Sequence, residues 1–127
     1  MSTAGTMQSL SEALGLSLPT GGVVPTASNF IEHLAYNAGK QIMALIDNDI
    51  RTSEILTLEA FENAIMVHAA IRGSTNALLH LPSIAYELGI DISIDLFDEI
   101  NEEVPYICNV RPSGFFPTNL FWYAGGV

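Results

Sequence analysis

The sequence predicts a mostly helical chain of about five helices with one or two short strands, and three observations lead to this fold class. Apolar residues recur at three- and four-residue intervals over most of the length, as they do in amphipathic helices. Glycine, proline and an Asp-Asn-Asp cluster separate these stretches. Only the run 104–110 (VPYICNV) has the character of a strand.

Composition places the 127 residues in one soluble domain that is large enough to bury a core. Hydrophobic residues make up 49% of the chain and charged residues 14%, which excludes the disordered class. The formal charge of −10 would repel a phosphate backbone, so we expect no nucleic-acid partner. No apolar run reaches the roughly 18 residues needed to span a bilayer, and the start lacks a signal-peptide pattern. We therefore expect a cytoplasmic protein without a membrane partner.

The first expected helix covers residues 1–15 and is ended by Gly15. Its apolar face is formed by Met7, Leu10, Ala13 and Leu14. Hydroxyl residues gather at its start, where they can cap free N–H groups or line a pocket, capping being the more frequent use. These residues are Ser2, Thr3 and Thr6. The stretch 16–27 contains two prolines and a Gly-Gly pair, and it is therefore expected to be a loop.

The next helix is expected to begin after Asn29 and to run to about Ile46, with the most regular pattern in the chain. Asn29 followed by Glu32 predicts a capping pair at its start. The side chains expected on its inner face are Ile31, Leu34, Ala35, Ala38, Ile42 and Leu45. Residues 47–49 (DND) predict a turn, and residues 52–56 a short helical turn.

The stretch 57–88 predicts two helices that meet at a Gly-Ser-Thr-Asn corner, around which the rest of the chain is expected to pack. Thr57 can cap the first helix. Its buried stripe is expected to contain Leu58, Phe61, Ile65 and Ala69. Gly73 is expected to end this helix with a positive φ angle. Ser74 is expected to cap the second helix by accepting a hydrogen bond from the backbone of Asn76 or Ala77.

The corner permits two interpretations. A helix N-terminus with the side chains of Ser74, Thr75 and Asn76 would present free N–H groups that suit an anion such as a carboxylate. The same residues also form ordinary turns between helices, where capping alone explains their choice.

Two histidines and a proline interrupt the apolar pattern of this stretch. Pro82 should kink or split the second helix, because its ring lacks the N–H that would bond back to Leu78. His68 and His80 lie on opposite sides of the corner, and neither has a metal-ligand spacing such as His-Glu-x-x-His. The single cysteine, Cys108, permits no internal disulfide and cannot by itself hold an iron–sulfur cluster. We therefore expect no metal ligand among these residues.

The C-terminal third contains apolar segments without visible partners. Residues 95–101 predict a short acidic amphipathic turn, and the strand 104–110 needs a sheet supplied from elsewhere. Residues 115–127 (FFPTNLFWYAGGV) form a dense aromatic stretch that ought to be buried under more protein. Together with an abrupt start, these features predict an internal piece of a larger protein.

Three groups of motifs resemble, in the expected order, segments of the dihydroxy-acid and sugar-acid dehydratase family, which includes phosphogluconate dehydratase. The first group is 1–7 (MSTAGTM) with 12–19 (EALGLSLP). The second group is 57–64 (TLEAFENA) with 73–77 (GSTNA) and the His80-Leu81 pair. The third group is 111–114 (RPSG) with 123–127 (YAGGV). The match extends over nearly the whole chain, and three motif groups in the expected order make the resemblance specific.

The resemblance implies a hydro-lyase that removes water from a branched-chain dihydroxy acid or an aldonic acid to give a 2-keto acid. It implies a full-length parent, several times longer, that contains a magnesium ion and an iron–sulfur cluster acting as Lewis acid on the departing hydroxyl. The family's cluster cysteines, magnesium ligands and catalytic serine lie outside this segment, and Cys108 matches none of them. Residues 1–127 would then be the helix-rich, incomplete part of an N-terminal α/β domain, holding no cofactor and inactive alone. We expect the parent to bind a small hydroxy acid and to be a homo-oligomer.

The corner pattern and the resemblance together assign five polar residues to a pocket for the substrate or the cluster: Ser74, Thr75, Asn76, Ser2 and Thr3. Many members have Gly-Gly-Ser-Thr-Asn where this chain has Arg72 before Gly-Ser-Thr-Asn, which adds a cation beside the proposed anion site. A second class of function stays open, namely a self-standing acidic helical domain that binds a protein partner through its aromatic C-terminus. The order of the motifs favours the dehydratase.

Overall fold

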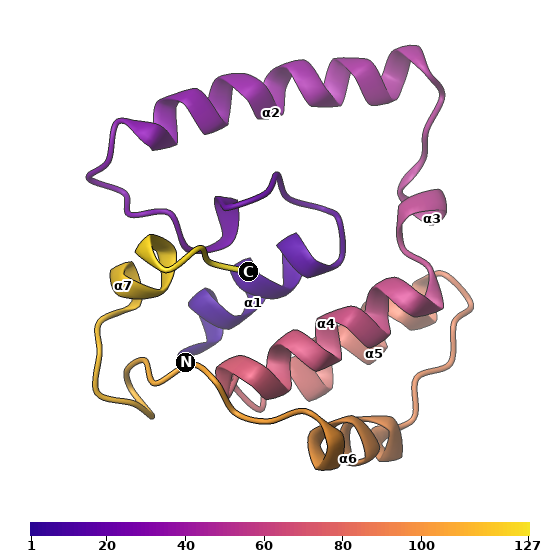
Figure 1. The fold of residues 1–127 in the computed structure, drawn as a ribbon. Helices are drawn as coiled ribbons and strands as arrows, with labels where there is room; N and C mark the ends of the chain where they lie inside the picture. The colour runs from indigo at the N-terminus through magenta and orange to yellow at the C-terminus, as the bar shows by residue number, and fades with distance from the viewer.

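The computed structural model describes residues 1–127 and shows seven α-helices and one short 3₁₀ turn, with no β-strand (Figure 1). In chain order the elements are α1 (Thr3–Ala13), η1 (Gly21–Val23), α2 (Phe30–Asp47), α3 (Thr52–Ile55), α4 (Leu58–Ile71), α5 (Ala77–Glu87), α6 (Ile94–Glu103) and α7 (Thr118–Tyr123). The prediction of a mostly helical chain is confirmed, although about five helices were expected. The helix α7 was not predicted, and none of the helices is both long and apolar enough to cross a membrane.

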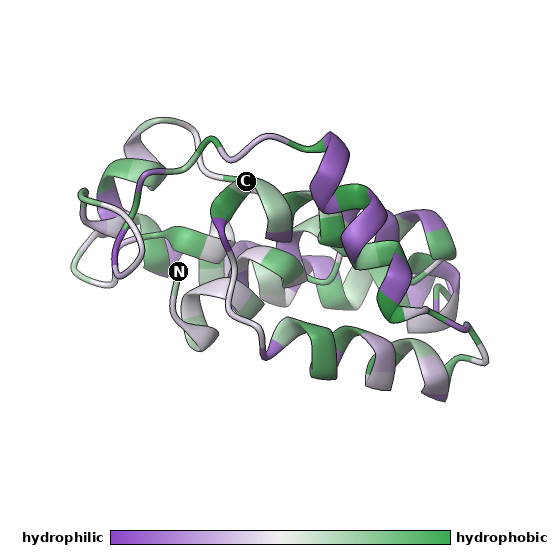
Figure 2. Ribbon diagram, turned by 90° about the horizontal axis from the view of Figure 1, so that it is seen from below, coloured by the Kyte–Doolittle hydropathy of each residue, from purple (hydrophilic) through white to green (hydrophobic).

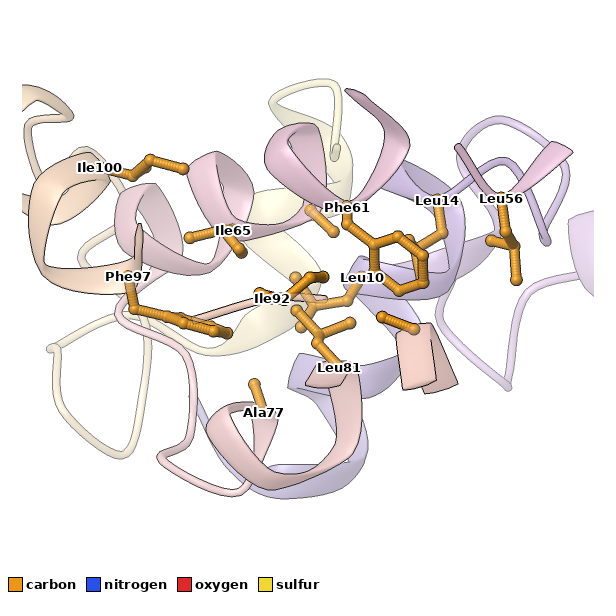
Figure 3. Packing of buried hydrophobic residues seen from close by; sticks show 12 residues of the cluster. Leu10, Leu14, Leu56, Phe61, Ile65, Ala77, Leu81, Ile92, Phe97 and Ile100 are labelled. Atoms are coloured by element: carbon orange, nitrogen blue, oxygen red, sulfur yellow. The ribbon is translucent and has the colours of Figure 1, made fainter. Parts of the chain in front are cut away.

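The hydrophobic core lies where α1 packs against α4, and α5 and α6 complete it (Figure 3). Leu10, Phe61 and Leu81 come from three different helices, are fully buried and point toward one another. The core side chains are Leu10, Leu14, Leu56, Phe61, Ala64, Ile65, Ala77, Leu81, Ala85, Ile92, Phe97 and Ile100. The predicted apolar stripes of α1 and α4 are thus largely confirmed. The prediction that Leu58 is buried was wrong. Leu58 is 43% exposed, because it is the first residue of α4 and the packed face begins one turn later at Phe61.

Hydrophobic and hydrophilic residues alternate around the helices, as amphipathic packing requires (Figure 2). The helix α6 shows the pattern clearly, because Phe97 and Ile100 are buried whereas Asp95, Asp98 and Glu99 are exposed. The acidic amphipathic turn expected at 95–101 is therefore confirmed and extends to a helix of 10 residues.

The helix α2 forms over nearly the predicted range, but it buries no residue at all. It lies apart from the other helices along one side of the molecule (Figure 1). Of the expected inner face, Ile31, Leu34 and Leu45 are half-buried, whereas Ile42 is 53% exposed. A groove of about 700 Å³, lined by Leu16, Leu18, Ala38, Gln41, Ile42, Leu45 and Val127 among others, separates α2 from the loop after α1. The expected burial is wrong for this chain because nothing within it fills that groove.

Of three helix ends that the sequence specified, one forms as predicted and two differ. Thr57 caps α4, since its hydroxyl accepts a hydrogen bond of 3.3 Å from the Ala60 N–H. Asn29 makes no capping hydrogen bond, because it already has helical backbone angles; Ser28 accepts from the Phe30 N–H instead. The left-handed residue at the end of α4 is Arg72, with φ of 49°, and not Gly73 as expected.

Pro82 was expected to kink or split the second helix of the central unit. The helix is not split, because α5 runs continuously from Ala77 to Glu87 with Pro82 inside it. A single proline removes one backbone hydrogen bond, and burial of the neighbouring Leu81 and of Ala85 holds the turn together.

The segment 104–110 is extended but forms no strand, so the strand prediction is wrong within this chain. The N–H groups of Ile107 and Cys108 donate to the Ala70 carbonyl at the end of α4, and one isolated bridge joins Val110 to Phe116. The chain contains no neighbouring strand, and the apolar side chains of the segment pack only in part, because Ile107 is 73% exposed. Cys108 and Val110 form a small second core with Met1 and Ile71.

The aromatic C-terminus is only partly covered. Trp122 packs edge-on against Phe30 at the start of α2, with ring centroids 5.6 Å apart. Phe115 and Tyr123, by contrast, are 73% and 69% exposed. The chain's own residues therefore do not bury this stretch.

Candidate functional site

A polar corner forms where the start of α1 meets the turn between α4 and α5. The hydroxyl oxygens of Thr3 and Ser74 lie 3.2 Å apart, although the two residues are 71 positions apart in the sequence. The Asn76 side-chain amide donates a hydrogen bond of 2.6 Å to the Thr3 hydroxyl. We use the term polar corner for the five residues that the sequence assigned to a pocket, namely Ser2, Thr3, Ser74, Thr75 and Asn76.

The fold brings three of these five side chains into mutual contact. The Thr3 hydroxyl is hydrogen bonded to both the Ser74 hydroxyl and the Asn76 amide, whereas no hydrogen bond joins the side chain of Ser2 or Thr75 to these three residues. Ser2 occupies the N-cap position of α1 without making a capping hydrogen bond. Ser2 and Thr75 are both exposed, so their hydroxyls are available to another molecule at the same surface.

The N-terminus of α5 differs from the expectation. Ser74 does accept a hydrogen bond of 3.3 Å from the Asn76 N–H, as predicted, but α5 begins only at Ala77. The N–H groups of Ala77 and Leu78 already donate to the carbonyls of Ser74 and Thr75. The expectation of free N–H groups at these positions is therefore wrong, because the turn itself satisfies them. A ligand at the polar corner would meet side-chain hydroxyls and one amide instead.

Two buried side chains are hydrogen bonded to the backbone of Ser74. The Ser74 N–H donates to the Thr6 hydroxyl at 2.9 Å, and the His68 Nε2 atom lies 3.0 Å from the Ser74 carbonyl oxygen. Thr6 is fully buried and His68 is 7% exposed. Burial lowers the pKa of His68, and the hydrogen bond to Ser74 opposes that shift. The sequence alone did not predict that Thr6 or His68 binds the Ser74 backbone. The signal available for His68 was its position on the same apolar face of the helix as Phe61 and Ile65.

The glycine of the corner is required by close contact and not by its φ angle. A Cβ atom on Gly73 would lie 2.3 Å from the His68 Cδ2 atom and 3.0 Å from the Thr6 Cγ2 atom. Only a residue without a side chain fits between them. The left-handed conformation that usually favours glycine falls one position earlier, on Arg72.

Arg72 contributes the cation that the sequence suggested beside the corner. Its guanidinium carbon lies 4.1 Å from the centre of the Tyr106 ring, which is a cation–π contact. The side chain is exposed and forms no ion pair; Arg51 and Asp49 form the one ion pair of the structure, at 3.7 Å. The Arg72 carbonyl accepts a hydrogen bond of 2.7 Å from the Met1 nitrogen, which ties the start of α1 to the end of α4.

The residues that could bind a metal do not gather anywhere in the structure. No group of three His, Cys, Asp or Glu side chains is close enough to hold a metal ion. Cys108 is buried in the small second core with Met1 and Ile71, and burial raises the pKa of its thiol. His80 is exposed on α5, whereas His68 is buried and its ring contacts the Ser74 carbonyl and Phe97. The largest groove is also separate from the polar corner, because it lies beside α2.

The family comparison and the comparison with curated proteins both identify dehydratases as relatives of this chain. Residues 1–127 match the family described as dihydroxy-acid/6-phosphogluconate dehydratase N-terminal. The dihydroxy-acid dehydratase of Caldicellulosiruptor saccharolyticus is 46% identical over 127 residues, which is 100% of this chain and 23% of that protein. The dihydroxy-acid dehydratase of Pyrococcus abyssi is likewise 46% identical over 127 residues, 100% of this chain and 23% of that protein. That of Methanosphaera stadtmanae is 50% identical over 113 residues, 88% of this chain and 21% of the relative. The chain thus spans less than a quarter of the length of these curated relatives.

Proposed function

This chain belongs to the dihydroxy-acid/6-phosphogluconate dehydratase family, and on that premise we propose that it forms part of a hydro-lyase. The reaction would remove water from a branched-chain dihydroxy acid or an aldonic acid and give a 2-keto acid. In this proposal the enzyme acts in the cytoplasm, and the polar corner lines the pocket that binds the acid substrate.

The observation that supports the proposal most directly is the contact between Thr3, Ser74 and Asn76. They come from two of the motif groups that resemble the family, 71 positions apart, yet their polar atoms meet at one surface. Hydroxyl and amide groups can donate and accept hydrogen bonds, which suits a substrate rich in hydroxyls with one carboxylate. None of the corner side chains titrates near neutral pH, so we assign to them binding and orientation and no proton transfer.

The family resemblance implies an iron–sulfur cluster and a magnesium ion, and the donor set of residues 1–127 does not fit either. An iron–sulfur cluster is held by several thiolates, whereas this chain has one cysteine, which is buried. Magnesium prefers carboxylate oxygens, and no cluster of acidic side chains is present that could hold it. We therefore assign no ligand in this chain and derive no chemical step from either group.

A chimaera tests the role of the corner in catalysis. Residues 1–127 would replace the matching residues of the Caldicellulosiruptor saccharolyticus dihydroxy-acid dehydratase, and formation of 2-keto acid from a dihydroxy acid would be measured. If the corner binds substrate, Ser74→Ala and Asn76→Ala should each lower kcat/KM at least about tenfold at equal iron content. Asn63→Ala is the matched control, because Asn63 is exposed on α4 and forms no side-chain hydrogen bond.

The alternative to a binding role is that the corner only caps a helix. Ser74→Ala would then cost about 1 kcal/mol of stability with nearly unchanged turnover, and Asn76→Ala would have little effect. Wild-type turnover in the Asn76→Ala chimaera would contradict the proposal.

The isolated chain should have no dehydratase activity of its own. Without a Lewis acid the hydroxyl is a poor leaving group, and this segment offers no substitute for one. Purified chain would be incubated with iron, sulfide, magnesium and a panel of aldonic and dihydroxy acids. Keto acid above the background rate would contradict this expectation.

We also propose that further protein, including a second copy of the subunit, covers part of this surface. The accessible surface is 7811 Å², whereas a folded monomer of 13.7 kDa is expected to expose about 6,600 Å². The excess of about 1,200 Å² exceeds the roughly 800 Å² that each partner buries in a typical stable interface. Exposed Ile42, Met43, Phe115 and Tyr123 contribute to it. A clean monomer by light scattering at high concentration would contradict association of the isolated chain.

A further inference from the structure

His68 differs from the other two histidines of the chain in its surroundings. His33 and His80 are exposed on their helices, whereas His68 is 7% exposed in the last turns of α4, directly under the polar corner. We propose that His68 is a positioning residue, whose Nε2–H holds the Ser74 carbonyl and thereby fixes the Ser74 hydroxyl against Thr3 and Asn76. The effect of His68 on catalysis rests on the proposed function of the polar corner, whereas its effect on the geometry of Ser74 does not.

The hydrogen bond fixes the tautomer of the ring. A carbonyl oxygen can only accept, so the proton of the neutral imidazole must be on Nε2, 3.0 Å from the Ser74 oxygen. The other nitrogen, Nδ1, is then an acceptor, and it is buried without a hydrogen-bond partner. Burial lowers the pKa of the ring, which keeps it neutral at pH 7.

The unpartnered Nδ1 atom makes histidine a costly choice for this site. An apolar side chain would pack in the core without leaving a buried acceptor unsatisfied. Phe97 contacts the ring edge-on, with ring centroids 6.2 Å apart, and thus provides apolar surroundings. The feature that an apolar side chain would not supply is the Nε2–H directed at Ser74.

The ring and the corner backbone are also in direct contact. A Cβ atom on Gly73 would clash with the ring at 2.3 Å, so the imidazole lies against the peptide that leads into Ser74. On the other side, the Thr6 hydroxyl accepts from the Ser74 N–H. Both backbone polar groups of Ser74 are therefore held by buried side chains. Its Oγ atom is left to contact Thr3 and the Asn76 N–H.

Two conservative variants separate the Nε2 position from the Nδ1 position. His68→Gln places an amide N–H near the position of Nε2, whereas His68→Asn places one near the position of Nδ1. His68→Leu removes both nitrogens, and His80→Leu is the exposed control. All four would be made in the 127-residue chain, and the hydrogen exchange of the Ser74 and Asn76 amides would be measured by NMR.

We expect the Ser74 and Asn76 amides to exchange at least about tenfold faster in His68→Leu and His68→Asn than in the wild type. His68→Gln should restore exchange to within about threefold of the wild type, and His80→Leu should not change it. Nitrogen NMR of the wild-type imidazole should show the Nε2-protonated tautomer. A protonated Nδ1 atom, or equal rescue by His68→Asn and His68→Gln, would overturn the inference.

The catalytic consequence is measured separately in the chimaera described above. There His68→Asn should lower kcat/KM about tenfold at equal iron content, and His68→Gln should recover most of it. Unchanged kcat/KM in His68→Asn, while Ser74→Ala is impaired, would overturn the positioning role. If Ser74→Ala and Asn76→Ala keep wild-type turnover, the proposed function of the corner fails, whereas the exchange and tautomer results still decide how Ser74 is held.

Discussion

The helix α2 and the polar corner are opposite cases of how sequence relates to packing. The pattern of α2 is the most regular in the chain, yet none of its 18 residues is buried. The corner consists of short polar residues without periodicity, yet it brings Thr3 to 3.2 Å from Ser74 across 71 positions. Beneath it, Thr6 and His68 are both buried.

The contrast between α2 and the polar corner shows what helical periodicity predicts and what single residues predict. Amphipathic periodicity predicts which face of a helix is apolar, but it does not predict which part of the protein covers that face. A close approach between backbones depends instead on single residues, here a glycine between a histidine ring and a threonine methyl group. We therefore compare substitutions in the core or the corner with substitutions on α2. Each pair tests whether the stability of the chain depends on the contacts seen in the structure or on the apolar pattern of the sequence.

The largest expected difference is between Phe61 in the core and Ile42 on α2. Phe61→Ala should lower the free energy of unfolding by about 3–5 kcal/mol, because it leaves a cavity between α1, α4 and α5. Ile42→Ala should change it by no more than about 0.5 kcal/mol, since Ile42 is 53% exposed. Urea unfolding of both variants measures the difference. A loss for Ile42→Ala as large as that for Phe61→Ala would show that α2 is buried in solution by a partner.

A second pair compares two glycines. Gly73→Ala should destabilise the chain by about 1–3 kcal/mol, because the new methyl group would displace the wedged His68 ring. Gly39→Ala should stabilise it by about 0.5–1 kcal/mol, since Gly39 lies inside α2 and no atom is within 4 Å of a Cβ placed there. Thermal unfolding of both variants would show shifts of opposite sign. Equal tolerance of alanine at both positions would contradict the close contact at the corner.

The sequence was sufficient for the elements that depend on local patterns. It predicted α1, α2, α4 and α5 and the Thr57 cap, because periodicity and capping act within one helical turn. It could not predict that α2 buries nothing or that 104–110 forms no strand, since both depend on what else is present to pack against. It also did not predict the two side chains that bind the Ser74 backbone. The hydrogen bond from the Ser74 N–H to the Thr6 hydroxyl depends on the contact of α1 with the turn after α4, and the His68 contact with the Ser74 carbonyl depends on how that turn folds back.

A third prediction concerns pH. Burial lowers the pKa of His68 in the folded chain, so the unfolded chain binds this proton more readily. The contribution of His68 to stability should therefore be complete above about pH 6.5, the ordinary pKa of histidine, and should be lost as the pH falls toward the lower folded pKa. The free energy of unfolding of the wild type and of His68→Gln would be compared between about pH 7.5 and about pH 5. The wild type should lose stability relative to His68→Gln as the pH falls, whereas exposed His80→Gln should follow the wild type throughout.

The smallest expected effect separates two helix caps that looked equivalent in the sequence. Thr57→Ala should cost about 1 kcal/mol, because it removes the acceptor of the Ala60 N–H at the start of α4. It should also raise the pKa of Glu59, which hydrogen bonds from its own backbone and from the Thr57 hydroxyl now lower. Asn29→Ala should cost no more than a few tenths of a kcal/mol, since Asn29 makes no capping hydrogen bond and α2 packs weakly. Urea unfolding with NMR titration of Glu59 measures both effects. A loss of about 1 kcal/mol for Asn29→Ala would show that Asn29 caps α2 in solution and that the start of this helix is held more firmly than its exposure indicates.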